Sequence, residues 1–258
     1  MGPAGARVSV LGDLAAWLSE ASTWSGEGGI PLRVLEHLRI SAIALAAAAA
    51  VALPLGLYIG HTGRGEVVAV SVANLGRAIP SFAILALAFP IALELGLGLS
   101  DWPAIAALFL LGIPPILTNA YVAVKGVDPD TVEAARGMGL SGRDVLSSIE
   151  IPLAAPLIVA GIRISAVQIV ATATLAAVVA GGGLGRFIVD GFAQGDDGMT
   201  LGGALLVAFL AIAIEIGFGL LERATTPRNE RRGVFTTRTR RVDVADPGRP
   251  AGDALLGA

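Results

Sequence analysis

Residues 133–152 read EAARGMGLSGRDVLSSIEIP, a charged and glycine-rich segment in a chain that is otherwise strongly apolar. The segment lies between two apolar stretches, residues 103–124 and 152–179. Each stretch has at least the ~20 residues that an α-helix needs to cross a hydrocarbon core about 30 Å thick. The segment is therefore predicted to be a polar loop that joins two membrane-spanning helices.

The composition of the whole chain agrees with this prediction. Of its 258 residues, 54% are hydrophobic and 15% are charged, and the mean hydropathy is +0.75. An open sheet would leave backbone N–H and C=O groups unpaired in lipid, so helices are expected. The sequence thus predicts an all-α integral membrane protein. Because the chain contains no cysteine, disulfides, thiolate metal sites and thiol nucleophiles are excluded.

Five apolar segments are long enough to span a membrane. Two of them, residues 67–93 and 152–179, exceed the required length and contain proline or polar residues, so we expect a tilt, a bend or a break there. The predicted spans are residues 40–59, 67–93, 103–124, 152–179 and 201–221.

These spans divide the chain into three parts. Residues 1–38 are predicted to form an extracytoplasmic or interfacial segment, and residues 39–222 a transmembrane domain with a cytoplasmic loop at 126–151. Residues 223–258 are rich in Arg, Pro, Gly and Asp and are predicted to be a disordered cytoplasmic tail. Residues 8–20 place apolar side chains on one helical face, which suits a helix in the membrane interface or a short helix packed on the bundle.

The Lys and Arg residues near the span ends predict the orientation, since cytoplasmic loops carry an excess of them. With five spans, the N-terminus is predicted to lie outside and the C-terminus in the cytoplasm, in the cytoplasmic (inner) membrane. The basic side holds Arg64, Lys125, Arg136, Arg143, Arg223, Arg228, Arg231 and Arg232, and the other side holds Arg7, Arg33, Arg39 and Arg186 together with Glu94, Asp101, Asp190, Asp196 and Asp197.

The polar loop has local signals for two short helices. Asp128 is a good N-cap and Pro129 suits the first helical position. Gly137 and Gly139 favour the end of that helix after about two turns. Ser141 and Asp144 have the spacing of a capping box, which starts a second helix. The prediction is a helix, a glycine turn and a helix that leads to the next span.

A helix of about two turns is not stable alone in water, so the first helix has to pack against another surface. Val132, Ala135 and Gly139 share a small, mildly apolar face, and Glu133 and Arg136 flank it. This pattern favours a cytoplasmic partner that approaches the loop closely. The alternative is that the loop folds back on its own bundle.

The spacing within the loop resembles a known signature. The loop has EAA at residues 133–135, Gly139 after three further residues and IEIP at 149–152 after nine more. This spacing resembles the EAA signature of ABC importer permeases, EAA-x3-G-x9-I-x-L-P. Ile151 stands where Leu is usual, a change that conserves volume. The resemblance implies a type I ABC importer permease fold, in which this loop transmits the closure of a separate ATPase to the membrane gate.

The candidate residues for coupling to that ATPase combine the signature with the docking face. They are Val132, Glu133, Ala134, Ala135, Arg136, Gly139, Ile149 and Pro152.

Flanking sequences narrow the resemblance. The chain contains NLGRAIPSFAIL (74–85), VDPDTVEAARGMG (127–139) and GIRISAVQIVATATLAAVVAGGGLG (161–185). These stretches look like permeases of osmoprotectant importers of the glycine betaine, carnitine and choline class. That resemblance implies a five-span core, an identical or related second permease subunit, an external substrate-binding protein and partner ATPase subunits that bind ATP and Mg²⁺. The chain itself is then expected to have no catalytic site and no cofactor.

The function that follows is the ATP-driven import of a compatible solute, of the glycine betaine, choline, carnitine or proline betaine type, by alternating access. Two alternatives remain open from the sequence. One is a permease of the same architecture for another small solute such as an amino acid. The other is a membrane scaffold or sensor subunit that transports nothing.

Several polar groups lie inside the predicted spans. Arg77 and Arg163 are at a depth where an unpaired guanidinium is unfavourable, and Glu215 is a candidate partner for either. These groups either line the translocation path or its gate, or form a packing ion pair. The candidate path residues are Asn74, Arg77, Pro80, Asn119, Arg163, Gln168, Thr172 and Glu215.

Other chemistry has little support in the sequence. The glycine-rich stretch 181–200 follows no predicted strand and contains no G-x-x-x-x-G-K-[ST], so it is not expected to bind phosphate. Its Phe187, Ile188 and Phe192 predict a short helix packed on the bundle. His37 and His61 are isolated and outside any metal or nucleophile motif, so we expect no metal site. The expected surroundings are lipid and protein subunits, without nucleic acid.

Aromatic residues are 5% of the chain and scattered. A cation–π cage for a quaternary ammonium ion is therefore not expected in this chain. Substrate selectivity is expected to reside mainly in the external binding protein.

Overall fold

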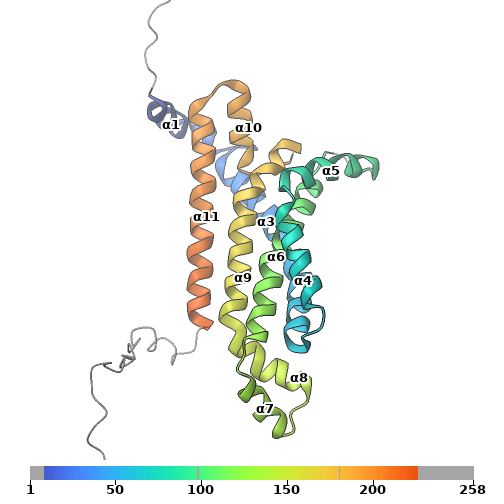
Figure 1. Cartoon of the computed structure of the whole chain (residues 1–258). Coiled ribbons are helices and arrows are strands. Elements are labelled where there is room, and N and C mark those ends of the chain that lie inside the picture. Colours follow the sequence, from blue (N-terminus) through green and yellow to red (C-terminus); the bar gives the residue numbers. More distant parts are fainter. Residues whose placement is uncertain (1–8, 98, 180, 226–258) are drawn as a thin grey trace, which may run out of the picture. The chain divides into compact units, whose positions relative to one another are not determined.

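The structure is a computed structural model that describes residues 9–97, 99–179 and 181–225, with the backbone alone described at residues 68, 72, 75 and 77. All regular elements in these ranges are helical (Figure 1). They are α1 (Val10–Ser19), α2 (Ala21–Trp24), α3 (Ile30–Thr62), α4 (Glu66–Ala78), α5 (Ser81–Glu94), α6 (Trp102–Lys125), α7 (Pro129–Gly137), α8 (Gly142–Val145), the π-helical turn η1 (Leu146–Glu150), α9 (Ile151–Thr172), the 3-10 helix η2 (Ala173–Val179), α10 (Gly185–Gln194) and α11 (Asp197–Thr225).

Within the described residues, four helical segments are long and apolar enough to cross a membrane: α3, α6, the run from α8 to η2, and α11. They contain the predicted spans at 40–59, 103–124, 152–179 and 201–221. Helix α6 packs against α3 and α9, and α9 packs in turn against α11 (Figure 1). The predicted tail lies outside the described residues from position 226 onward.

The predicted span at residues 67–93 does not form one helix. The structure has two helices there, α4 and α5, separated by Ile79 and Pro80, and Pro80 has extended backbone angles (φ −61°, ψ 128°). Proline has no N–H to donate, and its ring disfavours the helical conformation of the residue before it. Helix α5 has 14 residues, fewer than the ~20 needed to cross alone. Of the tilt, bend or break expected in this segment, the structure has the break, and a membrane crossing by residues 67–93 stays a prediction.

A stripe of small residues brings α3 close to α6. Ala44, Ala48 and Ala52 are fully buried on α3. One turn further on, a Cβ at Gly56 would lie 2.7 Å from the Cβ of Ala120, which is closer than real Cβ contacts. Residues four apart lie on one helical face, and small residues at such positions let helix backbones approach closely in a membrane.

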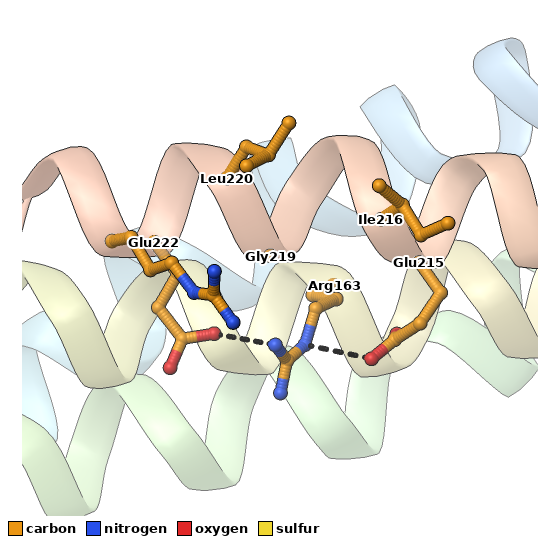
Figure 2. Close-up of a pocket in the computed structure, with 7 residues that line it drawn as sticks. Arg163, Glu215, Ile216, Gly219, Leu220 and Glu222 are labelled. Carbon is orange, nitrogen blue, oxygen red and sulfur yellow. Dashed lines mark ion pairs between the residues drawn. The ribbon is translucent and has the colours of Figure 1, made fainter.

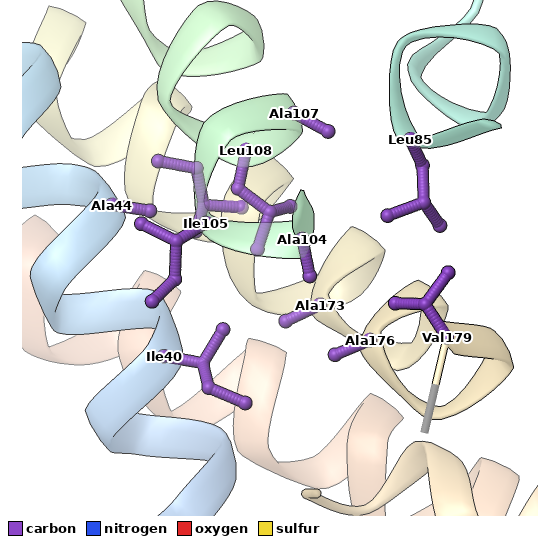
Figure 3. Close-up of a cluster of buried hydrophobic side chains, with 11 residues drawn as sticks. Ile40, Ala44, Leu85, Ala104, Ile105, Ala107, Leu108, Ala173, Ala176 and Val179 are labelled. Carbon is purple, nitrogen blue, oxygen red and sulfur yellow. The ribbon is translucent and has the colours of Figure 1, made fainter. Parts of the chain in front are cut away.

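A larger apolar cluster fills the space between α3, α5, α6 and the α9–η2 junction (Figure 3). Ile40, Leu85 and Leu108 are almost fully buried in it. Through this cluster, α5 is attached to the bundle although it is too short to span a membrane. The buried members are Ile40, Ala44, Leu85, Ala104, Ile105, Ala107, Leu108, Ile169, Ala173, Ala176 and Val179.

The N-terminal helix α1 packs against α11. Trp17 is 8% exposed, and its ring lies edge-on to Phe187 with centroids 5.2 Å apart. A Cβ at Gly202 would overlap the Trp17 ring, so glycine is required for this contact. Phe187 belongs to α10, the short helix that the sequence predicts, and α10 also packs on α11.

Candidate functional site

The polar loop folds as a helix, a glycine turn and a helix. The Asp128 side chain caps α7 by accepting a hydrogen bond from the Asp130 N–H at 3.1 Å. Gly139 has φ +90°, a conformation that side chains other than glycine rarely adopt. Ser141 and Asp144 form the capping box that starts α8, with backbone–side chain distances of 3.2 and 3.3 Å. The predicted local structure is confirmed at each of these positions.

The second helix of the loop does not end before the next span. Helix α8 passes through η1 into α9, so the helical run is continuous from Gly142 to Thr172. In η1 the Ile151 N–H donates to the carbonyl of Leu146, five residues earlier. Pro152 follows directly and has no N–H for the regular pattern, and a π-turn is one way for a helix to continue past it. We call residues 142–172 the arm.

The two faces of α7 differ in burial. Ala135 is 2% exposed, and Val132 packs on a cluster of the chain's own helices. These two side chains therefore face the bundle. Part of the predicted docking face is therefore used for intramolecular packing, while Gly139, its third member, is exposed, and contact of this face with an ATPase stays a prediction. The cluster under Val132 consists of Ala123, Val124, Val127 and Ala154.

The outward face of α7 and the glycine turn is exposed. Met138 is 75% exposed, and Glu133, Ala134, Arg136 and Gly139 are also exposed. Any external protein that meets the loop therefore contacts a surface with one acidic, one basic and several small or flexible side chains.

The two remaining coupling candidates lie where the arm begins. Ile149 is partly buried and Pro152 is exposed. Between them Glu150 is 4% exposed, and its Oε2 lies 2.6 Å from Nδ1 of His61 at the end of α3. No sequence pattern predicts this pair, because the two residues are 89 positions apart.

Arg163 lies between two glutamates of α11 (Figure 2). The Arg163 Nη1 is 2.8 Å from Oε2 of Glu222, and the Arg163 Nε is 3.6 Å from Oε1 of Glu215. Glu215 was identified in the sequence as a candidate partner, whereas Glu222, the nearer carboxylate, was missed. A pocket of about 290 Å³ is lined here by Arg163, Glu215, Ile216, Gly219, Leu220, Glu222 and Arg223.

A second pocket of about 300 Å³ lies between α4, α6 and α9. It brings together two predicted path residues, Asn119 and Gln168. The Asn119 amide N–H donates to the Pro115 carbonyl at 2.8 Å. The lining residues are Gly76, Leu111, Pro114, Pro115, Asn119, Ile164 and Gln168.

The other predicted path residues are not part of this pocket. Asn74 and Pro80 are exposed on or next to α4, and Thr172 is partly buried at the end of α9. The side chain of Arg77 lies outside the described part of the structure. In the described residues, no three His, Asp or Glu side chains are grouped closely enough to hold a metal ion.

Comparison with known proteins decides the family. The sequence model of the family described as "Binding-protein-dependent transport system inner membrane component" matches residues 52–230. The chain belongs to this family. It is an inner-membrane permease with several spanning helices, and the resemblance found in the sequence is confirmed.

Two relatives illustrate the sequence similarity. The permease is 39% identical over 193 residues, 75% of this chain and 87% of the relative, to the glycine betaine/carnitine/choline transport system permease protein OpuCB of Bacillus subtilis. It is 33% identical over 196 residues, 76% of this chain and 91% of the relative, to the osmoprotectant import permease protein OsmW of Salmonella typhimurium.

The fold of the permease also matches a solved structure. An inward-facing conformation of the MetNI methionine ABC transporter aligns with a TM-score of 0.68 and 22% identity, covering 81% of this chain and all of the other. At this identity the match shows that the permease shares the fold of a type I ABC importer permease.

Proposed function

We propose that the permease is the membrane subunit of an ATP-driven importer, with its N-terminus outside and the α7 end of the bundle in the cytoplasm. The charges at the two ends support this orientation, since cytoplasmic ends are enriched in Lys and Arg. Around the α7 end lie Arg64, Lys125, Arg136, Arg143 and Arg223, and around the α10 end lie Asp101, Asp190, Asp196 and Asp197. The proposed core has five spans, with α4 and α5 together completing one crossing.

The observation that carries the proposal is the mechanical connection between the loop and the bundle. Helix α7 is seated on the chain's own helices by Val132 and Ala135. The arm runs without a break from Gly142, just after the glycine turn, to Thr172 at the end of α9. A force on the exposed surface of the loop is therefore passed along a continuous helix. We propose that Glu133, Ala134, Arg136 and Gly139 contact a separate ATPase, which binds ATP and Mg²⁺.

Under this proposal Ile149 and Pro152 mark where the arm enters the bundle rather than where the ATPase binds. A partner that moves a two-state gate from 1:99 to 99:1 has to favour one state by about 5.5 kcal/mol. The free energy of docking at the loop has to differ between the two gate states by an amount of this order.

We propose that the pocket at Asn119 and Gln168 forms part of the solute path. Polar side chains in a span are unfavourable against lipid and require protein or water. Gln168 is exposed, so a second permease subunit, identical or related, is the proposed cover. Uncharged amides of this kind wet a passage without holding a zwitterion tightly. An external substrate-binding protein at the α10 end then supplies the selectivity.

The relatives support the choice of solute. Proteins that are 33–39% identical over three quarters of the chain are permeases named for glycine betaine, carnitine, choline or osmoprotectants. We therefore propose a compatible solute of this class, carried by alternating access. The structural neighbours named for methionine and amino acids are 18–22% identical, and at that level they support the fold without favouring an amino acid.

Reconstitution into vesicles with the ATPase and the binding protein tests the proposal. ATP-dependent accumulation of radiolabelled glycine betaine or choline is expected, and a fully assembled complex without accumulation would favour a scaffold subunit.

A substitution at the glycine turn tests the coupling role. Gly139→Leu forces a side chain into φ +90° on an exposed turn, so membrane insertion is expected to be normal while ATP-driven uptake is lost. Gly137→Leu is the matched control, because a Cβ at Gly137 meets nothing within 4 Å and its φ is not positive. Normal uptake by the Gly139→Leu variant would contradict the assignment of the loop.

A further inference from the structure

Glu150 is the one carboxylate among the described residues that is buried, with 4% exposure. Burying a carboxylate is unfavourable unless it has a partner. The partner is His61, whose Nδ1–H donates to Oε2 of Glu150 over 2.6 Å, and the His61 side chain is itself 18% exposed. The pair is therefore enclosed by protein on most sides.

The pair joins two elements that are remote in sequence. His61 lies in the last turn of α3, and Glu150 is the last residue of η1 in the arm. The other side of the imidazole ring also faces the arm, because a Cβ at Gly142 would lie 3.4 Å from Nε2 of His61. The ring is thus held against the arm at both α8 and η1.

Glu150 lies in the one turn of the arm that is π-helical. In η1 the Ile151 N–H bonds to the carbonyl of Leu146, where a regular α-helix would use the residue four positions earlier. A π-turn adds a residue to the turn, changes the direction of the side chains that follow, and is frequent at functional sites. The turn that carries Glu150 is therefore the place where the arm departs from a uniform helix.

Resting on the function proposed above, we propose that the His61–Glu150 hydrogen bond is the contact that makes α3 move with the arm when the ATPase displaces the loop. A buried ionisable pair is seldom a large source of stability, and its best-attested role is to fix the register of packed elements. Here the register is that of the arm against the end of α3. The EAA spacing leaves position 150 open, and His61 lies outside the loop, so the signature assigns neither residue this role.

The mechanical consequence is specific. With the pair in place, a shift of the loop moves α9, through the continuous arm, and α3, through His61, by the same amount. Without the pair, the arm is able to slip along α3, and ATP hydrolysis then opens the path less often. His61 and Glu150 act as positioning residues, because their effect on the solute is transmitted through the helices.

The test uses the complete transporter, reconstituted with its ATPase and binding protein, and measures ATP hydrolysis and solute uptake in the same vesicles. The main variant is His61→Leu with Glu150→Leu, because replacing a buried pair by apolar residues commonly preserves folding. We expect its melting temperature and subunit composition to match the unchanged complex. The ATP consumed per solute molecule is expected to rise about fivefold or more.

Two further variants make the result specific. His61→Asn places an amide N–H near the position of Nδ1, so it is expected to keep the ATP-to-solute ratio within about twofold of the unchanged complex. The control is Glu66→Leu with Lys125→Leu, which removes another ion pair at the same end of the bundle. In this pair the Lys125 Nζ lies 2.6 Å from Oε2 of Glu66, and the Glu66 and Lys125 side chains are 39% and 50% exposed. This pair joins α4 to α6 and includes no residue of the arm, so its removal is expected to leave the ratio unchanged.

The outcomes separate the inference from the proposed function. If uptake and hydrolysis fall in parallel with the amount of assembled complex, the pair is only structural and the inference is overturned. The same holds if the apolar double variant keeps a normal ratio, or if the control pair changes it as much. If the unchanged complex itself shows no ATP-driven uptake, the proposed function fails, and this inference fails with it.

Discussion

Helices α6 and α11 are both long and apolar, but their surroundings differ. In the apolar stretch of α6, 56% is buried by the rest of the described chain, compared with 6% in α11. Yet α11 is the more hydrophobic of the two. In water the more apolar helix would be expected inside, whereas lipid tails are as apolar as a leucine side chain and give no such preference.

What distinguishes α6 is the size of its residues and of those that face it. Gly112 of α6 is buried, and a Cβ there would come within 3.0 Å of both Ala48 and Ile169. Large side chains on α11 are exposed instead, with Phe209 at 72% and Leu220 at 60%. Close packing, which small residues permit, decides burial in this fold, while the amount of apolar surface does not.

The strongest test of this comparison makes one substitution in the close contact of α3 with α6 and one on the exposed surface of α11. Gly56→Leu inserts a side chain where a Cβ would already lie 2.7 Å from Ala120 and 2.9 Å from the Leu117 carbonyl. Gly217→Leu on α11 meets nothing within 4 Å. The first is expected to destabilise the permease by about 3 kcal/mol and the second by less than about 0.5 kcal/mol. Thermal unfolding of the purified permease in detergent measures both.

Equal stability of the Gly56→Leu and Gly217→Leu variants would contradict the comparison. It would mean that α3 and α6 are able to separate without loss of stability, as two helices do when contacts with lipid replace their contacts with each other.

The ion pairs of Arg163 provide a second, smaller test, because they attach the exposed α11 to α9. The contact with Glu222 is 2.8 Å and that with Glu215 is 3.6 Å, where the Glu215 side chain is 50% exposed. Glu222→Gln is therefore expected to lower the stability by about 1 kcal/mol. Glu215→Gln is expected to have less than about half that effect, because exposed pairs are weak.

The measurement is again thermal unfolding, now at low and at high salt. The loss of stability caused by Glu222→Gln should shrink only slightly in high salt, since partly buried ion pairs are screened less than exposed ones. A larger loss from Glu215→Gln than from Glu222→Gln would show that the shorter contact is not the one that holds α11.

The sequence predicted those parts of the structure that depend on near neighbours. Asp128, Gly139 and the Ser141–Asp144 capping box act over a few residues, and the loop they predict has the expected form. The effect of Pro80 on the backbone is also local, so a break in the segment 67–93 was foreseen although its consequence, two separate helices, was not.

The parts that were not predicted depend on contacts between distant elements. The packing of Val132 and Ala135 on the bundle was not predicted, because a helix has two sides and the sequence does not state which one the bundle covers. Glu150 and His61 are 89 residues apart, and neither residue has a neighbour that marks it. Charged groups in spans require partners, but this rule does not choose between Glu215 and Glu222.

The smallest expected effect concerns a buried hydroxyl that links α9 to α6. Ser165 is fully buried, and its Oγ–H donates to the Gly112 carbonyl at 3.0 Å. Such bonds in membrane proteins contribute about 0.6 kcal/mol on average, because the separated helices find other partners. Ser165→Ala is therefore expected to lower stability by about 0.6 kcal/mol, and Ser71→Ala, at an exposed position of α4, by less. If close packing and not hydrogen bonding holds α6 in the centre, the Ser165→Ala loss has to remain well below that of Gly56→Leu. A loss as large as that of Gly56→Leu would mean that the buried position of α6 rests on this polar contact, and small residues would then permit the burial without causing it.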